Sequence, residues 1–190
     1  MQWVLNTYAP VKFPTGCHLI ADDEASTGLQ SRTQIFSALN NLVRQQGHDT
    51  GRFELRKHDS GKPYGFLGGK PIGVSISHCR SMLLCATYTE GEIGVDVEPC
   101  DRKLHPRLRD RICHPEEVSL LPEDLCCIRM WTVKEAALKY LGTGLRMAMN
   151  KIKLDIIGEH QFQADIDQDC ILVYSFIFRD HWIAVATQNN

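Results

Sequence analysis

Apolar and polar residues alternate along residues 91–99, which read Gly-Glu-Ile-Gly-Val-Asp-Val-Glu-Pro. A period of two is typical of a β-strand, whose successive side chains point to opposite faces. Asp96 and Glu98 are two positions apart, so the pattern predicts that both carboxylates project from one face. Pro99 is expected to end the strand, because proline cannot donate to the ladder of hydrogen bonds. The carboxylate pair is therefore expected at a strand end.

A helical pattern covers residues 131–145, Trp-Thr-Val-Lys-Glu-Ala-Ala-Leu-Lys-Tyr-Leu-Gly-Thr-Gly-Leu. Strong helix formers fill its middle, and Gly142 and Gly144 are residues expected just past a helix end. Glu135 and Lys139 are four residues apart, so they share one helix face. Apolar residues in the same turns require burial. The pattern therefore predicts that this charged pair lies at the edge of a core.

The rest of the pattern predicts an α+β fold. An amphipathic helix is expected over residues 29–46, and residues 47–70, rich in Gly, Lys, Arg and Pro, are interpreted as a loop region. Further segments have the pattern of strands: residues 73–78, 82–88, 151–157, 171–178 and 181–187. We predict two similar subdomains, residues 1–98 and 99–190, each a helix packed on a small antiparallel sheet, with the active site at their interface.

Composition and charge narrow the class of protein. The chain has 190 residues and a formal net charge of −2, which argues against general nucleic-acid binding, since that needs a basic excess. No apolar run has the length of a membrane span, and the first residues lack the character of a signal peptide. The eight cysteines have no C-x-x-C spacing and are expected to be reduced thiols. We expect a cytoplasmic monomer that binds neither nucleic acid nor membrane.

The carboxylates of the strand and of the helix indicate metal and phosphate chemistry. Mg²⁺ is commonly held by one or two carboxylates and completes its shell with water and substrate phosphate. Asp96 and Glu98 are suited to this role, Glu135 could add a third oxygen, and Lys139 could contact a phosphate. The alternative is a strand whose polar face is simply exposed to water, beside a surface ion pair that contributes little.

Other stretches also carry candidate ligands. Lys62 follows Gly61 in Ser-Gly-Lys-Pro, and the glycine lets the backbone approach an anion that the ammonium can pair with. Ser77 and His78 end a predicted strand, but without an orienting carboxylate or a G-x-S-x-G elbow they do not indicate a hydrolase. Arg32 lies on the polar side of the helix expected over residues 29–46, and this pattern alone favours a solvated side chain.

Taken together, these stretches resemble the 4′-phosphopantetheinyl transferases. The resemblance rests on Gly61-Lys62-Pro63, Ser77-His78, Gly94-Val95-Asp96-Val97-Glu98 and Trp131-x-x-Lys134-Glu135-x-x-x-Lys139. They occur in the family's order and spacing over about residues 60–145. The match is to the larger, pseudo-dimeric type (surfactin-synthetase-activating or enterobactin) rather than to the small trimeric holo-acyl-carrier-protein synthases. Each motif alone is common, whereas the combination is specific.

The resemblance implies a reaction in which the phosphopantetheine arm of coenzyme A moves to a serine hydroxyl of an apo carrier protein, leaving adenosine 3′,5′-bisphosphate. It implies that Asp96, Glu98 and Glu135 hold Mg²⁺ on the diphosphate. Glu135, directly or through a water, would take the serine proton, and Lys139 would meet the phosphates. The residues implied in binding coenzyme A, and its 3′-phosphate in particular, are Arg32, Lys62, Ser77 and His78.

Two positions depart from the family's pattern. Leu39 stands where a second arginine is expected on the first helix, and Ser75 replaces an asparagine two residues before Ser77.

Small members of the family dock acidic carrier proteins on basic residues that follow the Gly-x-Asp strand. In this chain those positions hold Arg102, Lys103, Arg107, Arg109 and Arg111.

Two other classes of protein remain open on the sequence alone. A Mg²⁺-dependent phosphodiesterase or nuclease would use the same carboxylates with water as the nucleophile. A non-catalytic binding module would carry the carboxylates only as surface residues, and divalent metal would then affect neither its stability nor its binding. The carrier protein, whether of fatty-acid, polyketide or peptide synthesis, is not specified by the residues.

Overall fold

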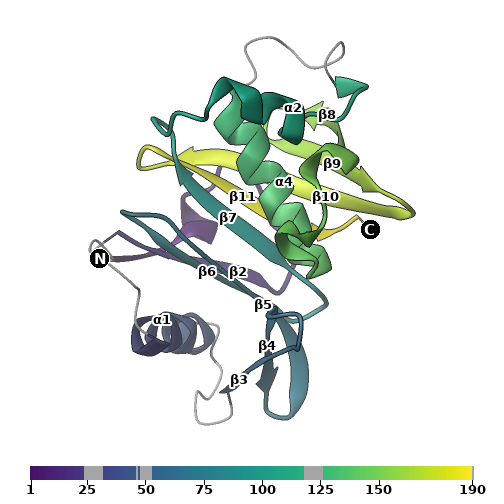
Figure 1. Ribbon diagram of the computed structural model, residues 1–190. Coiled ribbons are helices and arrows are strands. Elements are labelled where there is room, and N and C mark those ends of the chain that lie inside the picture. The colour runs from purple at the N-terminus through teal and green to yellow at the C-terminus, as the bar shows by residue number, and fades with distance from the viewer. Residues whose placement is uncertain (24–31, 46, 48–52, 118–125, 190) are drawn as a thin grey trace.

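Two antiparallel sheets with helices packed on them form the described part of the protein (Figure 1). The structure is a computed structural model that describes residues 1–23, 32–45, 47, 53–117 and 126–189. One sheet has six strands in the order β1-β2-β6-β5-β4-β3, and the other has five in the order β7-β11-β10-β9-β8. The predicted α+β fold class is confirmed.

The first sheet and its helix come from the N-terminal half of the chain. Their bounds are β1 Gln2–Val4, the 3-10 turn η1 Leu5–Thr7, β2 Cys17–Asp22, α1 Arg32–Gln45, β3 Phe53–Lys57, β4 Pro63–Leu67, β5 Lys70–His78 and β6 Leu83–Tyr88. The described part of α1 lies within the predicted range 29–46. It packs on one face of the sheet through Leu39 and Leu42, which face Ile20 and Leu83 in one cluster.

The second sheet and its helix come from the C-terminal half. Their bounds are β7 Gly94–Pro99, η3 Pro106–Leu108, α2 Arg109–Ile112, α4 Cys127–Leu141, η4 Gly144–Arg146, η5 Met149–Lys151, β8 Lys153–Gly158, β9 Gln161–Ile166, β10 Asp169–Phe178 and β11 His181–Gln188. The helix α4 ends at Gly142, whose φ of 72° is left-handed. Glycine adopts this conformation without the penalty of a Cβ, so the predicted helix end is confirmed.

The layers are stacked in the order α1, six-stranded sheet, five-stranded sheet and α4 (Figure 1). A separate apolar cluster fills each of the three gaps between layers. Because both sheets are covered on two faces, β6 is buried along its whole length. This explains why residues 82–88 read as a continuous apolar run rather than as an alternating one.

The interpretation of residues 47–70 as a loop region was wrong over most of the described part. Phe53–Lys57 and Pro63–Leu67 pair as the antiparallel strands β3 and β4, and β4 pairs on with β5. Gly68 and Gly69, with φ of 58° and 82°, make the tight turn between β4 and β5. The glycines and prolines that suggested a loop are therefore turn and edge residues of a sheet.

The chain changes sheet between β6 and β7. Strand β7 pairs with β11, so the expected boundary at residue 98 falls inside a strand of the five-stranded sheet. The division into subdomains 1–98 and 99–190 stays a prediction. A hydrogen bond from the Val95 backbone N–H to Ser75 Oγ, 2.9 Å long and buried, joins β7 to β5 of the other sheet. No helix in the described ranges is long and apolar enough to cross a membrane.

Candidate active site

Asp96, Ser77 and Lys139 form a closed triangle of hydrogen bonds. Asp96 Oδ1 accepts from Ser77 Oγ at 2.7 Å and from Lys139 Nζ at 2.7 Å, and Lys139 Nζ also donates to Ser77 Oγ at 2.8 Å. The three side chains come from β7, β5 and α4. The site therefore lies where the two sheets and α4 meet.

Gly94 allows α4 to lie directly on β7. A Cβ atom at this position would stand 2.0 Å from the Ala136 carbonyl oxygen and 2.4 Å from the Tyr140 nitrogen, closer than any real contact. Because alternate residues of a strand share a face, Gly94 and Asp96 both face α4, while Val95 and Val97 enter the core between the sheets. The close approach at Gly94 brings Lys139 within reach of Asp96.

The second oxygen of Asp96 is a candidate ligand atom. Asp96 is only 4% exposed, and its Oδ2 is buried without a hydrogen-bond partner. Such an atom is costly, since buried polar groups are normally paired. The donor set around it, the carboxylates of Glu98 and Glu135, is the hard oxygen chemistry that Mg²⁺ prefers. These residues fit a magnesium ion, although no three carboxylate, imidazole or thiol groups in the described ranges form a ready-made metal cluster.

Glu135 is the most strongly perturbed carboxyl group of the site. It is 9% exposed, and burial, followed by the negative charge of Asp96, raises its pKa to about 7 despite the opposing effect of Lys139. Burial also raises the pKa of Glu98, and the hydrogen bond from Arg102 opposes that shift. Lys139 pairs with Asp96 rather than with Glu135, which differs from the pair expected from helical spacing. The carboxylates thus repel one another across a partly dry site.

The remaining sequence-predicted ligands lie apart from this triangle or outside the described side chains. Lys62 donates to the Tyr140 carbonyl oxygen at the C-terminal end of α4 and pairs with Glu92 at 2.5 Å. It lines a pocket of about 460 Å³ together with Tyr140 and Gly142. His78 is exposed at the end of β5. Arg32 is the first residue of α1, but its side chain lies outside the described residues.

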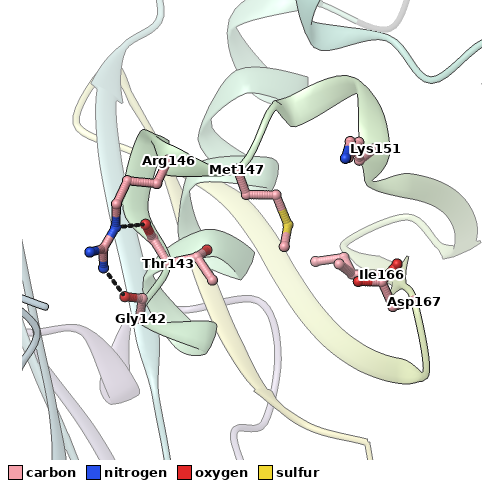
Figure 2. Close-up of a pocket in the computed structure, with 7 residues that line it drawn as sticks. All are labelled: Gly142, Thr143, Arg146, Met147, Lys151, Ile166 and Asp167. Atoms are coloured by element: carbon pink, nitrogen blue, oxygen red, sulfur yellow. Dashed lines mark hydrogen bonds between the residues drawn. The ribbon is translucent and has the colours of Figure 1, made fainter.

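A further pocket, of about 360 Å³, lies at the same end of α4 (Figure 2). Arg146 folds back to donate to the carbonyl oxygens of Thr143, at 3.1 Å, and Gly142, at 3.4 Å. In Figure 2, Lys151 and Asp167 stand on the other side of the pocket from this guanidinium. Positive side chains suit a helix C-terminus, where unpaired carbonyl groups concentrate negative charge. Arg146 therefore caps the helix that carries Glu135 and Lys139.

The two departures from the family pattern have structural roles of their own. Leu39 has no exposed surface and belongs to the core between α1 and the first sheet, so it offers nothing to a ligand. Ser75 is 3% exposed, and its hydroxyl accepts the Val95 N–H. It therefore fixes the strand of Asp96 against the strand of Ser77.

Sequence reasoning missed a buried ion pair beside the site. Lys134 has no exposed surface, and its ammonium donates to Glu117 Oε2 at 2.7 Å and to the carbonyl oxygens of Ile112 and Ile152 at 2.6 and 2.8 Å. Glu117 in turn accepts the Leu154 N–H at 2.6 Å. Burial lowers the pKa of Lys134, and the hydrogen bond that it donates to Glu117 opposes that shift. The sequence signal was Lys134 itself, a lysine on a helix face otherwise filled by apolar residues.

The basic residues that follow β7 are all exposed. Arg102 pairs with Glu98 and lies over the Trp131 ring, 5.4 Å from its centre. The others lie further along the connection to α2 and within it: Lys103, Arg107, Arg109 and Arg111.

Comparison with known proteins identifies the superfamily of the chain. A family model described as the 4′-phosphopantetheinyl transferase superfamily matches residues 92–186, half of the chain. The matched range begins just before β7 and includes all of α4 and most of β11. The chain belongs to this superfamily.

One relative adds a more particular likeness. A protein of the cyanobacterium Synechocystis sp., provisionally named a 4′-phosphopantetheinyl transferase, is 33% identical over 100 residues. The alignment covers 48% of this chain and 40% of the relative. It therefore spans less than half the length of either protein.

Proposed function

We propose that this protein transfers the 4′-phosphopantetheine group from coenzyme A to a serine hydroxyl of an apo acyl or peptidyl carrier protein, releasing adenosine 3′,5′-bisphosphate. The observation that carries this proposal is the buried, unpartnered Oδ2 of Asp96, beside Glu98 and a Glu135 whose pKa is raised to about 7. We further propose that it is of the larger, pseudo-dimeric type with holo-acyl-carrier-protein synthase activity, and that it acts as a cytoplasmic monomer.

Asp96, Glu98 and Glu135 would hold Mg²⁺. Bound there, the ion would neutralise charge on the diphosphate of coenzyme A. Asp96 is held in place by hydrogen bonds to Ser77 and Lys139. Residues of β5, β7 and α4 therefore fix the position of its unpaired Oδ2. Such preorganisation matters because a ligand that is already positioned does not need to reorganise when the substrate arrives.

Glu135 would take the proton from the carrier's serine hydroxyl, directly or through a water. A general base works best when its pKa lies near the working pH, and a pKa of about 7 meets this condition. Lys139, already hydrogen-bonded within the site, would contact a phosphate as a point charge. Its present partner, Asp96, has a second oxygen left for other ligands.

Lys62, His78 and Arg32, with Ser77 and Lys139, would bind the nucleotide end of coenzyme A. Lys62 lines the pocket of about 460 Å³ beside Tyr140, and its ammonium is within reach of ligand in that pocket. The exposed stretch of Arg102, Lys103, Arg107, Arg109 and Arg111 would dock an acidic carrier. Complementary charge mainly accelerates encounter.

The direct test incubates the protein with coenzyme A, Mg²⁺ and several apo-carrier proteins, and weighs the intact products. The proposal expects one carrier to gain the mass of a single phosphopantetheine group. Glu135→Gln should reduce transfer by on the order of 10²-fold or more, as removal of a group acting at the reacting centre commonly does. The control Glu159→Gln changes a glutamate whose side chain is 88% exposed and should leave transfer unchanged.

Two outcomes would overturn the proposal. Hydrolysis of coenzyme A or of nucleic acid without any carrier product would indicate a phosphodiesterase or nuclease. An absence of any product, together with no effect of Mg²⁺ on the melting temperature, would indicate a binding module. In the proposed enzyme, Mg²⁺ stabilises the wild type because it binds the folded state only, and Asp96→Asn should lose this stabilisation.

A further inference from the structure

A separate pocket of about 680 Å³ lies at the ends of β5 and β7 and the start of β11. Charged groups of both signs surround it. Its walls include the arginines Arg80 and Arg102 and the aspartates Asp101 and Asp180. Two side chains with nucleophile and base chemistry, Ser81 and His181, also line it. None of the roles proposed above uses Ser81, His181 or the neighbouring thiol of Cys79.

His181 is held in one tautomer by the backbone. Its Nδ1 lies 2.5 Å from the Arg179 carbonyl oxygen, and because a carbonyl can only accept, Nδ1 carries the proton. Nε2 lies 2.7 Å from Ser81 Oγ, and Ser81 Oγ lies 3.9 Å from Cys79 Sγ. Ser81 thus links the thiol of Cys79 to an oriented imidazole.

The surroundings of this cluster favour a thiolate. Burial raises the pKa of Cys79, but hydrogen bonds from His181 and Ser81 and the charge of His181 outweigh burial and lower it. The hydrogen bond with Cys79 raises the pKa of His181, and Asp180 adds to this. The Arg179 guanidinium is engaged elsewhere, over the Trp3 ring and with Asp23. Both pKa shifts favour a thiolate at Cys79 near a protonated His181, which is the environment of an activated thiol.

We propose that Cys79 is a reactive thiol that undergoes exchange with a small zwitterionic disulfide of the glutathione class bound in this pocket. Glutathione carries two carboxylates and one ammonium group. A carboxylate matches Arg80, since Arg102 is already paired with Glu98, and the ammonium matches Asp101 and Asp180. Cys79 is partly exposed, and its sulfur lies 3.9 Å from the hydroxyl of Ser81 in the pocket wall, so a disulfide bound in the pocket lies beside the thiol.

The exchange balances without any other reactant. The Cys79 thiolate attacks one sulfur of the disulfide, a new sulfur–sulfur bond forms, and the original one breaks. Glutathione thiolate leaves and takes a proton from solvent or from His181 Nε2. The reaction is favoured by a thiolate present at neutral pH.

The test uses the whole reduced protein and oxidised glutathione at pH 6.5, with acid quenching and mass spectrometry of the peptides. Cys170 is the internal control, since it is exposed and its sulfur is contacted by Asn189 rather than by an imidazole. Cys79 should acquire glutathione about tenfold faster than Cys170, because the lowered pKa of its thiol increases the thiolate fraction. This ratio should increase as the pH falls from 8 to 6. A ratio at or below one, or one that does not change with pH, would overturn the proposal without needing any variant.

Two variants locate the cause. His181→Gln should slow the reaction of Cys79 about tenfold and leave that of Cys170 unchanged, and an unchanged Cys79 rate would refute the role of the imidazole. Arg80→Ala should slow reaction with oxidised glutathione but not with the uncharged bis(2-hydroxyethyl) disulfide. Equal slowing with both disulfides, or with neither, would exclude recognition of the glutathione carboxylates by this pocket.

A consequence for the active site rests on the proposed function. Cys79 follows Ser77 and His78 directly, so the adduct would stand beside the residues proposed to bind coenzyme A. Glutathione treatment should then slow phosphopantetheine transfer, dithiothreitol should restore it, and Cys79→Ala should be insensitive to the treatment. If glutathione modifies Cys79 but does not slow transfer, the thiol exchange stands and only its effect on transfer is refuted. Absence of transfer before any treatment would instead count against the proposed function.

Discussion

Lys134 and Glu117 form an ion pair in the interior of the protein, with the ammonium 2.7 Å from the carboxylate and side chains 0% and 1% exposed. Glu117 approaches α4 from the segment after α2, and it also holds the N–H of Leu154 in β8. The pair therefore connects three elements around the helix that carries Glu135 and Lys139. Its contribution is positional, since burying two charges offsets much of their attraction.

We predict that breaking this pair destabilises the protein more than removing it. Glu117→Gln or Lys134→Met alone should lower the free energy of unfolding by about 3–5 kcal/mol, because each leaves an uncompensated buried partner. The double variant should lose less than the sum of the two. Urea denaturation followed by circular dichroism measures the three values. As a control, Glu54→Gln removes a partner of Arg56 in a pair that is more than half exposed on both sides and should change stability little.

Local patterns in the sequence predicted the elements that carry the site. The alternation over residues 91–99 predicted β7, and the glycine after a run of helix formers predicted the end of α4. Both signals depend on a few neighbouring residues, so they can be recognised without knowledge of the tertiary structure. The prediction of strands at 171–178 and 181–187 held for the same reason, since β10 and β11 are nearly regular hairpin strands.

Contacts between distant residues were less accessible from sequence. Helical spacing suggested a pair between Glu135 and Lys139, but Lys139 instead contacts Asp96 and Ser77, 43 and 62 residues away in the chain. Helical spacing shows which side chains share a helix face, but it does not show which residues of another element contact that face. The same limit hid the partner of Lys134 and the relay from Cys79 to His181, whose intermediate Ser81 lies 100 residues from that histidine.

Glu135 should make the folded protein less stable as the pH rises. Its folded pKa of about 7 exceeds the ordinary 4.5, so between these values the folded state binds more protons than the unfolded state. Stability contributed by this group is therefore present below pH 4.5 and is lost as the pH rises through 7. Without Mg²⁺, raising the pH from 5 to 8 should cost on the order of 2–3 kcal/mol more in the wild type than in Glu135→Gln. Equal pH slopes in the two proteins would contradict the shift.

Gly94 should be intolerant of any side chain. Its Cβ would overlap the Ala136 carbonyl oxygen at 2.0 Å, and backbone atoms cannot rotate away. Gly94→Ala should cost at least about 3 kcal/mol of unfolding free energy or prevent folding. At Gly91 the nearest atom to a new Cβ is 3.6 Å away, in the Tyr88 ring, so Gly91→Ala is the matched control and should fold normally. Similar melting temperatures for both variants would show that α4 can withdraw from β7.

Lys62 and His78 should distinguish coenzyme A from dephospho-coenzyme A, which lacks the 3′-phosphate. Lys62→Ala and His78→Ala should weaken coenzyme A binding by about tenfold, because a charge-assisted hydrogen bond is lost only where the phosphate exists. Calorimetric titration with both nucleotides measures the difference. Lys70→Ala is a suitable control, since Lys70 is an exposed residue at the start of β5. Equal weakening of the two nucleotides would mean that these residues act elsewhere on the molecule.

The exposed basic stretch after β7 should affect the binding of the carrier protein but not the binding of coenzyme A. Arg107 and Arg109 are exposed and lie in η3 and α2, away from the Asp96 triangle in sequence. Reversing both to Glu should raise the Michaelis constant for an acidic carrier about tenfold and leave that for coenzyme A nearly unchanged, since complementary charge mainly sets the association rate. Added salt should slow the wild type at limiting carrier, because mobile ions screen such attraction, and the double variant should lose this dependence. As a control, we use Lys151→Glu, which reverses an exposed charge in η5, after the C-terminal end of α4. This variant should keep the wild-type Michaelis constant for the carrier and the wild-type salt dependence. A double variant that keeps the wild-type carrier response and salt slope would place the docking surface on another face of the molecule.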